Sequence, residues 1–340
     1  MKLQERVSLS SLTTMRLGGT ARYVAKIDDN DSLLEVISFA HDHNLPWFVI
    51  GSGSNIIADG DYDGVIILNR IRGFEKVSED SASATYKIGA GEIWDSIVEK
   101  VCGLGLSGIE AMSAIPGRAG STPVQNVGAY GQEIADTLIG LDAYDTKNNE
   151  FVTLTPGDCK FSYRNSVFKD PATRHHIITS ITLRLRKNQL APPFYPALEK
   201  YLSANDITDF SPNNIRQAVI NVRAEKLPPV EKIASAGSFF KNPIVEKVVA
   251  EKLLSKFPDA PNWDMGENKV KLAAGWLIDQ AGLKGFSKYG MMVYPKNALV
   301  LVNNDATSYD DLDRFKSEIV DIIRDKFGIT LEQEPENLPS

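Results

Sequence analysis

The stretch Ala236-Gly-Ser-Phe-Phe-Lys-Asn-Pro243 places one small hydroxyl, that of Ser238, between a glycine and two phenylalanines. Such a hydroxyl could act as a positioned proton donor, and the glycine would let a ligand approach closely. The alternative is a turn that enters a helix, because proline is tolerated in a first helical turn and apolar residues follow at helical spacing. Taken alone, the stretch favours the turn.

A second unusual stretch runs from Ile115 to Gly131 and is rich in glycine. Its glycines let backbone N–H groups turn outward, and its hydroxyl and amide side chains add neutral donors, so it could cradle a pyrophosphate. The alternative is an ordinary glycine-rich connection. A structureless stretch of this length is uncommon inside a compact domain unless it is functional, so we favour ligand binding.

Two further stretches carry charged residues that could belong to a site, but their sequence patterns are less unusual. Tyr163 and Arg164 lie between apolar residues, where the guanidinium could face an anionic substrate or make an ordinary surface ion pair. Glu332 and Glu334 would share one face of any strand formed there. The arginine stretch leaves both interpretations open, and the glutamates alone favour a solvated acidic tail.

Familiar nucleotide-binding fingerprints do not fit this chain. Gly103, Gly105 and Gly108 match G-x-G-x-x-G, but they close a predicted helix instead of opening one after a strand. The stretch Gly51-Ser-Gly53 does follow a predicted strand, yet Ile56 stands at the third glycine position. The sequence contains no G-x-x-x-x-G-K-[ST] motif, which disfavours a P-loop kinase or ATPase.

Bulk properties limit the class of protein. The chain has 340 residues, a hydrophobic content of 43%, a charged content of 24% and a net charge of −7, which indicate a globular protein of two or three domains. Without a basic block, we expect no nucleic-acid partner. Cys102 and Cys159 fit no metal or redox spacing, and with four histidines, His175 and His176 adjacent, we expect no metal site. Lacking a secretory signal or an apolar run of bilayer length, the chain is expected in the cytoplasm, away from membranes.

Hydrophobic periodicity predicts two α/β parts followed by a mainly helical one. A capping-box pattern at Ser32 and Glu35 predicts a helix start, and Leu227-Pro-Pro229 is the clearest linker. The expected strands lie at 23–27, 47–50, 64–68, 152–154, 177–185 and 298–302, with another α/β stretch beginning near 85. The expected helices cover 93–103, 244–256, 269–281 and a last one ending at Gly328, and 188–196 is expected to be a loop.

Six stretches, in this order along the chain, together resemble the UDP-N-acetylenolpyruvoylglucosamine reductase (MurB) family. The insertion carrying Tyr195 resembles the first structural type of that family, which has an extra substrate-covering loop. The stretches are Gly51-Ser-Gly-Ser-Asn55, Ile115 to Gly131, Tyr163-Arg-Asn-Ser-Val-Phe-Lys169, Gly237-Ser-Phe-Phe-Lys-Asn-Pro243, Lys271-Leu-Ala-Ala-Gly-Trp-Leu-Ile-Asp279 and Leu331-Glu-Gln-Glu334.

The resemblance implies an α+β architecture with a PCMH-type (vanillyl-alcohol-oxidase-like) FAD-binding fold in two α/β parts and a C-terminal α+β substrate-binding domain. We expect the first FAD-binding part at 1–72 and the second at 73–226, joined by the C-terminal segment 329–340. The substrate-binding domain is expected at 227–328. The family also implies a monomer.

The implied enzyme is a UDP-N-acetylmuramate dehydrogenase, a cytoplasmic flavoprotein of peptidoglycan synthesis and hence of cell-wall biogenesis, cell shape and cell division. It uses non-covalent FAD and NADPH to reduce the enolpyruvyl group of UDP-N-acetylglucosamine enolpyruvate. By resemblance, Arg164 and Glu334 stabilise an enolate-like intermediate and Ser238 donates the proton. Two alternatives stay open: an alcohol oxidase of the same fold, often with tethered FAD, or a non-catalytic protein that binds a nucleotide-sugar.

The resemblance further implies binding residues, while three positions depart from the family pattern: Thr13, Arg118 and Gln333. The expected FAD contacts are Gly51, Ser52, Gly53, Ser54, Asn55, Ile115, Pro116, Gly117, Gly120, Ser121, Gln125, Asn126, Gly128, Ala129, Tyr130 and Ile177. The expected substrate contacts are Tyr130, Tyr163, Tyr195, Lys226, Asn242, Trp263 and Asn297.

Overall fold

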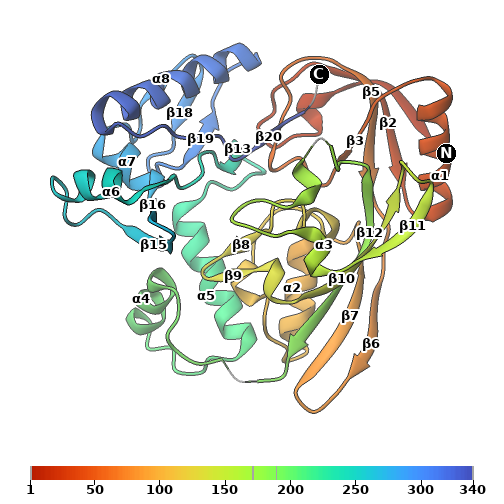
Figure 1. The fold of residues 1–340 in the computed structure, drawn as a ribbon, viewed down its shortest axis with the longest axis horizontal. Coiled ribbons are helices and arrows are strands. Elements are labelled where there is room, and N and C mark those ends of the chain that lie inside the picture. Colours follow the sequence, from red (N-terminus) through yellow and green to blue (C-terminus); the bar gives the residue numbers. More distant parts are fainter. Residues whose placement is uncertain (1, 171, 189, 339–340) are drawn as a thin grey trace. The chain divides into compact units, whose positions relative to one another are not determined.

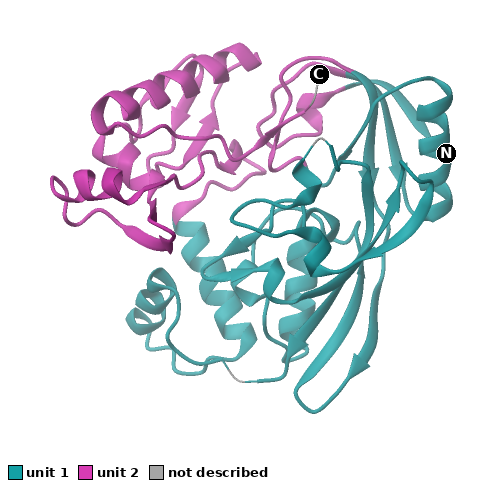
Figure 2. Cartoon of the chain, in the orientation of Figure 1, with its two compact units in different colours: residues 1–7, 21–52, 63–225 teal, residues 8–20, 53–62, 226–340 magenta. Residues whose placement is uncertain are grey.

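The computed structural model describes residues 2–170, 172–188 and 190–338, which divide into two compact units. Unit 1 comprises Met1–Val7, Ala21–Ser52 and Asp63–Glu225, and unit 2 comprises Ser8–Thr20, Gly53–Tyr62 and Lys226–Ser340 (Figure 2). Two short N-terminal segments therefore belong with the C-terminal part of the chain.

The first sheet of unit 1 has the strand order β1-β2-β5-β3, and β3 and β5 are parallel. Its core includes Leu33, Val36 and Ile37 of helix α1. The helix starts earlier than predicted, because Asp29 caps it: its carboxylate accepts the Ser32 N–H at 2.7 Å. The elements are β1 (Leu3–Ser8), β2 (Thr20–Ile27), α1 (Asn30–Asp42), β3 (Trp47–Ile50), β4 (Ile56–Ile57) and β5 (Tyr62–Asn69).

The second sheet of unit 1 is antiparallel throughout, with the order β11-β10-β12-β7-β6 (Figure 1). Helix α2 buries Trp94, Ile97 and Val101 in its core, whereas Ile93, predicted to be on that stripe, is the exposed N-cap. The elements are β6 (Phe74–Glu79), β7 (Ser83–Gly89), α2 (Trp94–Gly103), β8 (Gly128–Ala129), β9 (Gln132–Glu133), β10 (Leu138–Asp145), β11 (Glu150–Leu154), α3 (Pro156–Cys159) and β12 (His176–Arg186).

Unit 1 ends with two helices that the sequence analysis did not predict. Helix α4 (Pro196–Ala204) follows the expected loop, and α5 (Pro212–Lys226) is the longer of the two. Leu198, Leu202 and Val219 form a small core of their own, and the Tyr130 ring packs against it. The insertion that carries Tyr195 thus has its own apolar support.

Unit 2 contains two small sheets with the orders β13-β19-β18-β17 and β14-β16-β15. The helix predicted over 244–256 is a strand followed by a shorter helix, because Ile244 and Val245 pair with Lys271 and Val270 of β16. The helix predicted over 269–281 is shortened by the same pairing. The elements are β13 (Ala234–Ser238), β14 (Ile244–Glu246), α6 (Lys247–Leu254), β15 (Asn262–Gly266), β16 (Lys269–Leu272), α7 (Ala274–Gln280), β17 (Ser287–Lys288), β18 (Met291–Val293) and β19 (Val300–Asn303).

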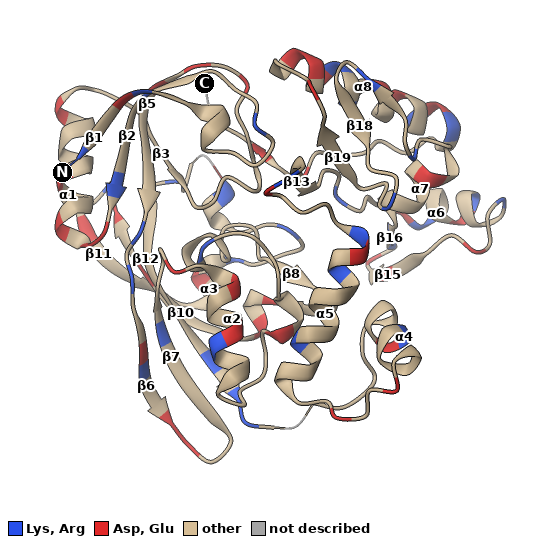
Figure 3. Cartoon of the chain, turned by 180° about the vertical axis from the view of Figure 1, so that it is seen from behind, with Lys and Arg blue, Asp and Glu red and all other residues tan. Residues whose placement is uncertain are grey.

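The last helix, α8 (Tyr309–Phe327), confirms its prediction. Ser308 and Asp311 form a capping box at its start, and Gly328 ends it with a φ of 70°. Its buried residues, among them Phe315 and Ile319, join the main core of unit 2. Acidic and basic residues are interspersed on its solvent side (Figure 3).

Beyond α8 the chain forms β20 (Glu336–Asn337), which pairs in parallel with β4. The division into two units does not correspond one to one to the three predicted parts, whose boundaries stay a prediction. Helices and mainly antiparallel sheets in both units confirm the α+β class. Within the described ranges, no helix is both long and apolar enough to cross a membrane.

We predict that Gly53→Ala destabilises the protein. Gly53 has a φ of 64°, and an added Cβ would lie 1.9 Å from the Leu12 carbonyl oxygen. A side chain forced into this conformation costs on the order of 1–3 kcal/mol before the clash is counted. Urea denaturation of the FAD-free protein measures the loss. Gly60→Ala is the matched control, since an added Cβ there meets no atom within 4 Å; equal stability of the two variants would contradict the argument.

Candidate functional site

The glycine-rich stretch of unit 1 is ordered by short local turns. Ala119–Ser121 forms a 3-10 turn in which the Ser121 hydroxyl accepts the Arg118 N–H at 3.1 Å and donates to the Arg118 carbonyl at 2.7 Å. Gly120 lies against β7, because an added Cβ would be 2.5 Å from that of Ala90. The stretch is therefore a fixed loop whose glycines permit close packing of backbone on backbone.

The loop after β3 lies against this turn. An added Cβ on Gly51 would come within 3.0 Å of the Ser121 Oγ. Gly51 and Ser121, far apart in sequence, were both predicted to contact FAD, and the structure brings them together. Gly117, with a φ of 144°, lies at the same place, since its added Cβ would be 3.4 Å from the Ser121 Oγ.

Asn126 holds the loop from inside. It is buried, with a φ of 45°, and its amide donates to Glu133 Oε2 at 2.6 Å and to the Ser162 carbonyl at 3.3 Å. Its Oδ1 accepts the Ala135 N–H at 3.3 Å. Because these bonds occupy the side chain, Asn126 shapes the loop, and the prediction that it contacts FAD stays untested.

Three arginines gather behind the loop. Burial, with repulsion from Arg70 and Arg72, lowers the pKa of Arg118 to about 10. The Nε of Arg118 and the Nη1 of Arg70 are buried and make no hydrogen bond within the described part of the chain. Arg118 Nη1 does donate to the Gly91 carbonyl. Arg118, noted as a departure from the family pattern, thus carries partly buried positive charge. Glu92 attracts this charge, but burial and the neighbouring arginines outweigh that attraction.

Arg164 is tied to the glycine-rich loop by its side chain. Ser162 and Asn165 exchange backbone hydrogen bonds of 3.1 Å, which leaves Tyr163 and Arg164 at the tip of a tight turn. Arg164 has a φ of 55°, its Nη2 donates to the Gly128 carbonyl at 2.8 Å, and its guanidinium lies 5.3 Å from the Tyr163 ring centroid. The turn therefore orients the guanidinium at the loop that ends with Tyr130.

Tyr130 links this loop to the insertion. Its ring meets that of Tyr195 edge to face, with the centroids 5.6 Å apart, and burial raises the pKa of its hydroxyl. Arg223 of α5 lies near Tyr130; its Nε is buried and makes no hydrogen bond to any described residue, and burial lowers its pKa. Arg223 was not among the residues predicted from the sequence. The available signal was its spacing of seven residues from Arg216, which puts both on one helix face, where Arg216 pairs with Asp95 at 2.6 Å.

In unit 2, main-chain pairing joins Glu334 to Phe239, the residue that follows Ser238. The Glu334 N–H donates to the Phe239 carbonyl at 2.9 Å, and the Lys241 N–H donates to the Glu332 carbonyl at 2.9 Å. Phe239 and Phe240 are 0% and 1% exposed, so their rings anchor this pairing in the core. Gly237 adopts a φ of 71°, and an added Cβ there would meet no atom within 4 Å.

The C-terminal segment also reaches the first predicted FAD loop. The Glu336 N–H donates to the Asn55 carbonyl at 2.9 Å, and the Thr14 N–H donates to the Gly53 carbonyl at 3.0 Å. Gly53, Ser54 and Asn55 therefore belong to unit 2, while Gly51 and Ser52 belong to unit 1. The two ends of this loop lie in different units.

The predicted substrate residues of unit 2 are spread over several elements. Asn242 accepts the Ala274 N–H at 3.0 Å at the start of α7, and Asn297 accepts the Leu299 N–H at 3.1 Å. Trp263 on β15 lies 5.3 Å from the Lys271 ammonium, and Lys226 ends α5. The two asparagine oxygens thus support local structure, whereas Trp263 and Lys226 are exposed.

The other predicted FAD residues lie in a sheet core, in a short strand and in the glycine-rich loop. Ile177 buries its side chain in the core of the first sheet, so only its backbone could meet a ligand. Gly128 and Ala129 form β8, whose partner is β9. Ile115, Pro116 and Gln125 lie within the ordered loop, where Pro116 is exposed and the other two are partly buried.

Comparison with known proteins gives concordant results. A family model described as UDP-N-acetylenolpyruvoylglucosamine reductase, C-terminal domain, matches residues 228–338, and an FAD binding domain model matches residues 21–155. The UDP-N-acetylenolpyruvoylglucosamine reductase of Ralstonia nicotianae is 38% identical over 336 residues, covering 98% of both chains. Its counterpart in Escherichia coli is 36% identical over 327 residues, covering 96% of this chain and 94% of the other.

A solved structure of the corresponding reductase from Thermus caldophilus covers 100% of both chains with a TM-score of 0.68 at 22% identity. This likeness shows a shared fold and, with the match to the FAD binding domain, confirms the predicted PCMH-type FAD-binding architecture. The identity to the two relatives, over nearly the full length of each chain, shows common family membership as well as a common fold. This chain belongs to the UDP-N-acetylenolpyruvoylglucosamine reductase family.

Proposed function

We propose that this chain is the NADPH-dependent flavoenzyme that reduces the enolpyruvyl group of UDP-N-acetylglucosamine enolpyruvate, giving UDP-N-acetylmuramate for peptidoglycan synthesis. Membership of the family supports the activity. The observation that best supports the residue roles is the backbone bond from Glu334 to Phe239, the residue that follows Ser238.

The residues of unit 1 fit FAD, whose diphosphate carries negative charge. Close-packed glycine loops can present backbone N–H groups. The buried Nη1 of Arg70 and Nε of Arg118 have no hydrogen-bond partner in the described ranges. When bound, FAD would pass a hydride from NADPH to the methylene carbon of the enolpyruvyl group. Burial raises the pKa of Cys102 to about 12 and that of Cys159 to about 11, so neither thiol favours a covalent tether.

Arg164 is proposed to hold the substrate carboxylate. Addition at the methylene carbon leaves negative charge on the carbon beside that carboxylate, and a preorganised guanidinium stabilises this charge at no reorganisation cost. The bond to Gly128 and the position above Tyr163 support such preorganisation. Tyr130, Tyr163, Tyr195, Lys226, Asn242, Trp263 and Asn297 are proposed substrate contacts, Tyr195 and Lys226 at the diphosphate.

Ser238 is proposed to give its proton to the carbon that carries the charge. A hydroxyl is a weak acid, but the carbanion is a strong base, so position decides the rate. The buried rings of Phe239 and Phe240 fix the backbone on the C-terminal side of Ser238, and Gly237 leaves room on the other side. Glu334 is proposed to act in its protonated form, because a carboxylate would repel the developing negative charge.

The chain is proposed to work in the cytoplasm as a monomer. Both cysteines are free and buried, as expected in a reducing compartment. Sedimentation of the FAD-loaded protein at a mass near 37.4 kDa would agree with a monomer, and a mass twice as large would not.

We predict that Ser238→Ala separates the two half-reactions. Anaerobic stopped-flow absorbance should show flavin reduction by NADPH at a near-native rate, and reoxidation by the enolpyruvyl substrate slowed at least ~100-fold, the lower range for a positioned acid. Ser235→Ala, on the same strand, is the control and should leave both rates near native. Equal slowing of both half-reactions by Ser238→Ala would count against the proton-donor role.

We predict that Glu334→Gln retains much of the reoxidation rate, within about tenfold of native, because an amide still donates a hydrogen bond. Glu334→Ala should lose ~100–1,000-fold, as removal of one oxyanion donor does. Glu332→Gln is the control, since this neighbour is exposed and its ion pair with Lys241, at 3.5 Å, lies on the surface. If Glu334→Gln is as slow as Glu334→Ala, the carboxyl does not act as a neutral donor.

We predict that Arg118→Met weakens FAD binding about tenfold, the loss expected for a hydrogen bond to a charged group. Methionine keeps the apolar length of the side chain and removes its charge. Quenching of flavin fluorescence measures the Kd, and the loss should shrink at high salt. Arg22→Met, which removes an exposed cation paired with Asp63, is the control. A native Kd in a folded Arg118→Met protein would rule out an electrostatic role.

A further inference from the structure

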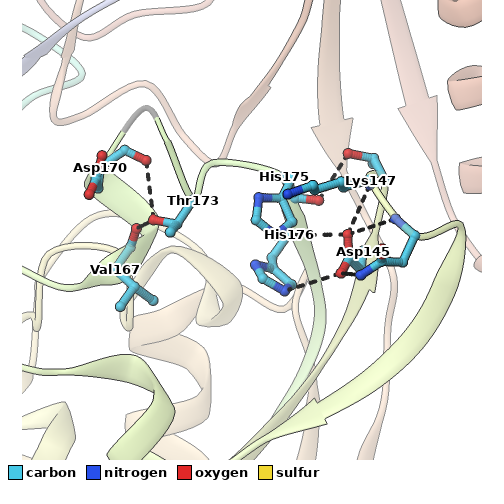
Figure 4. A network of polar contacts seen from close by, with 9 residues as sticks. Asp145, Lys147, Val167, Asp170, Thr173, His175 and His176 are labelled. Atoms are coloured by element: carbon cyan, nitrogen blue, oxygen red, sulfur yellow. Dashed lines mark hydrogen bonds and ion pairs between the residues drawn. The ribbon is translucent and has the colours of Figure 1, made fainter.

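A cluster of two histidines and one carboxylate lies in unit 1, apart from every residue assigned above to the flavin or the substrate except Ile177, which follows it. Asp145 ends β10, and the antiparallel register places it opposite His176 at the start of β12. His175 directly precedes that strand. In Figure 4 both imidazole rings point toward the Asp145 carboxylate.

The carboxylate is buried and held in one orientation. Its Oδ1 accepts the N–H groups of Lys147 at 2.8 Å and Asn148 at 3.2 Å, and its Oδ2 accepts the Asn148 side-chain amide at 2.8 Å. Asp145 is 4% exposed. These bonds leave lone pairs on both oxygens that can face the histidines.

The histidines are presented together by an irregular backbone. Successive residues of a regular strand point to opposite faces. Here the two ring centroids lie only 4.2 Å apart, with the ring planes at 37°. The Thr146 N–H and hydroxyl both donate to the His175 carbonyl, at 2.9 and 3.0 Å, and the Thr173 N–H before the pair donates to the Asp170 carbonyl at 3.0 Å. The chain is thus fixed on both sides of the cluster.

The distances inside the cluster suit an ion better than direct hydrogen bonds. His175 Nε2 lies 3.8 Å from Asp145 Oδ1, and His176 Nε2 lies 3.9 Å from Oδ2, both beyond the ~3.2 Å limit of an N–H···O bond. Two atoms bound to one tetrahedral Zn²⁺ at ~2.1 Å lie ~3.4 Å apart, so an ion would draw these side chains together by about half an ångström. One ligand atom from each of the three residues lies within 4.8 Å of the others.

The second ring nitrogen of His176 is a further sign of an incomplete environment. Its Nδ1 is buried and makes no hydrogen bond of standard geometry with any residue that the structure describes. The Phe168 ring meets the His176 ring edge to face at 6.3 Å. Besides Asp145 and His175, the Thr173 backbone is a polar neighbour of this imidazole.

We propose that Asp145, His175 and His176 bind one divalent transition-metal ion, with Zn²⁺ as the preferred occupant and water completing the coordination. Two imidazoles and one carboxylate select such ions over Mg²⁺ and Ca²⁺, which prefer oxygen ligands. The ion joins the end of β10 to the start of β12 and so stabilises the second sheet. This proposal replaces our sequence-based expectation of no metal site, which could not foresee that Asp145 faces the adjacent histidines.

Titration calorimetry of the untagged, FAD-loaded protein with Zn²⁺, after removal of metals by a chelator, tests the proposal. We expect one Zn²⁺ per chain for the native protein. His175→Ala/His176→Ala should weaken binding more than ~100-fold, because changes in outer-shell partners alone cost 10–100-fold. The matched control, His41→Ala/His43→Ala, removes the other two histidines of the chain and should bind Zn²⁺ as the native protein does.

Two further measurements keep a folding failure from hiding the answer. The bound-flavin spectrum reports whether each variant is folded, and Zn²⁺ should raise the Tm of the native protein and of the control only. Co²⁺ should give tetrahedral absorption bands that the His175→Ala/His176→Ala variant lacks. Absence of saturable Zn²⁺ binding to the native protein, undiminished binding by folded His175→Ala/His176→Ala, or loss of binding only in the His41→Ala/His43→Ala control would each overturn the proposal.

Discussion

The pairing of Phe239–Lys241 with Glu332–Glu334 supports the proposed chemistry of unit 2. Backbone hydrogen bonds set its register, and the buried rings of Phe239 and Phe240 hold it in the core. Truncation of a buried phenylalanine typically costs 3–5 kcal/mol, so the position of Ser238 is coupled to the stability of the whole unit. A hydroxyl on such a strand is placed more precisely than one on a free loop, which would suit the proton-donor role proposed for Ser238.

Unit 1 has a different task, because it must bind a cofactor with two negative charges at loops that expose few cationic side chains. Its loops pack so closely that several positions admit only glycine, as at Gly120 against Ala90. The guanidinium groups of Arg70 and Arg118 lie behind these loops, where burial and mutual repulsion make them costly in the absence of an anion. The negative charge of the diphosphate would offset that cost in the ligand-free protein. Relief of this unfavourable electrostatic energy would then contribute to the free energy of FAD binding.

Asp145 and its neighbouring histidines show how the same sheet could gain stability from a different source. Strands β10 and β12 pair at the centre of the second sheet, where Asp145 at the end of β10 lies opposite His176 at the start of β12. An ion at this end would act on the scaffold and not on the residues proposed for the chemistry.

The sequence by itself determined the family and, through it, the α+β class and the candidate residues of the site. The reason is that six short stretches matching the family pattern follow one another in the family's order over nearly the whole chain. Local signals also placed α8, whose capping box and terminal glycine lie within its own segment. Tertiary structure decided what depends on partners distant in sequence. Residues 244–246 form a strand and not the predicted helix because they pair with β16. Glu334 is not part of a solvated tail, because its backbone bonds to Phe239, the residue after Ser238. Arg223 and the Asp145 cluster escaped prediction for the same reason, since burial and proximity arise only when separate segments pack.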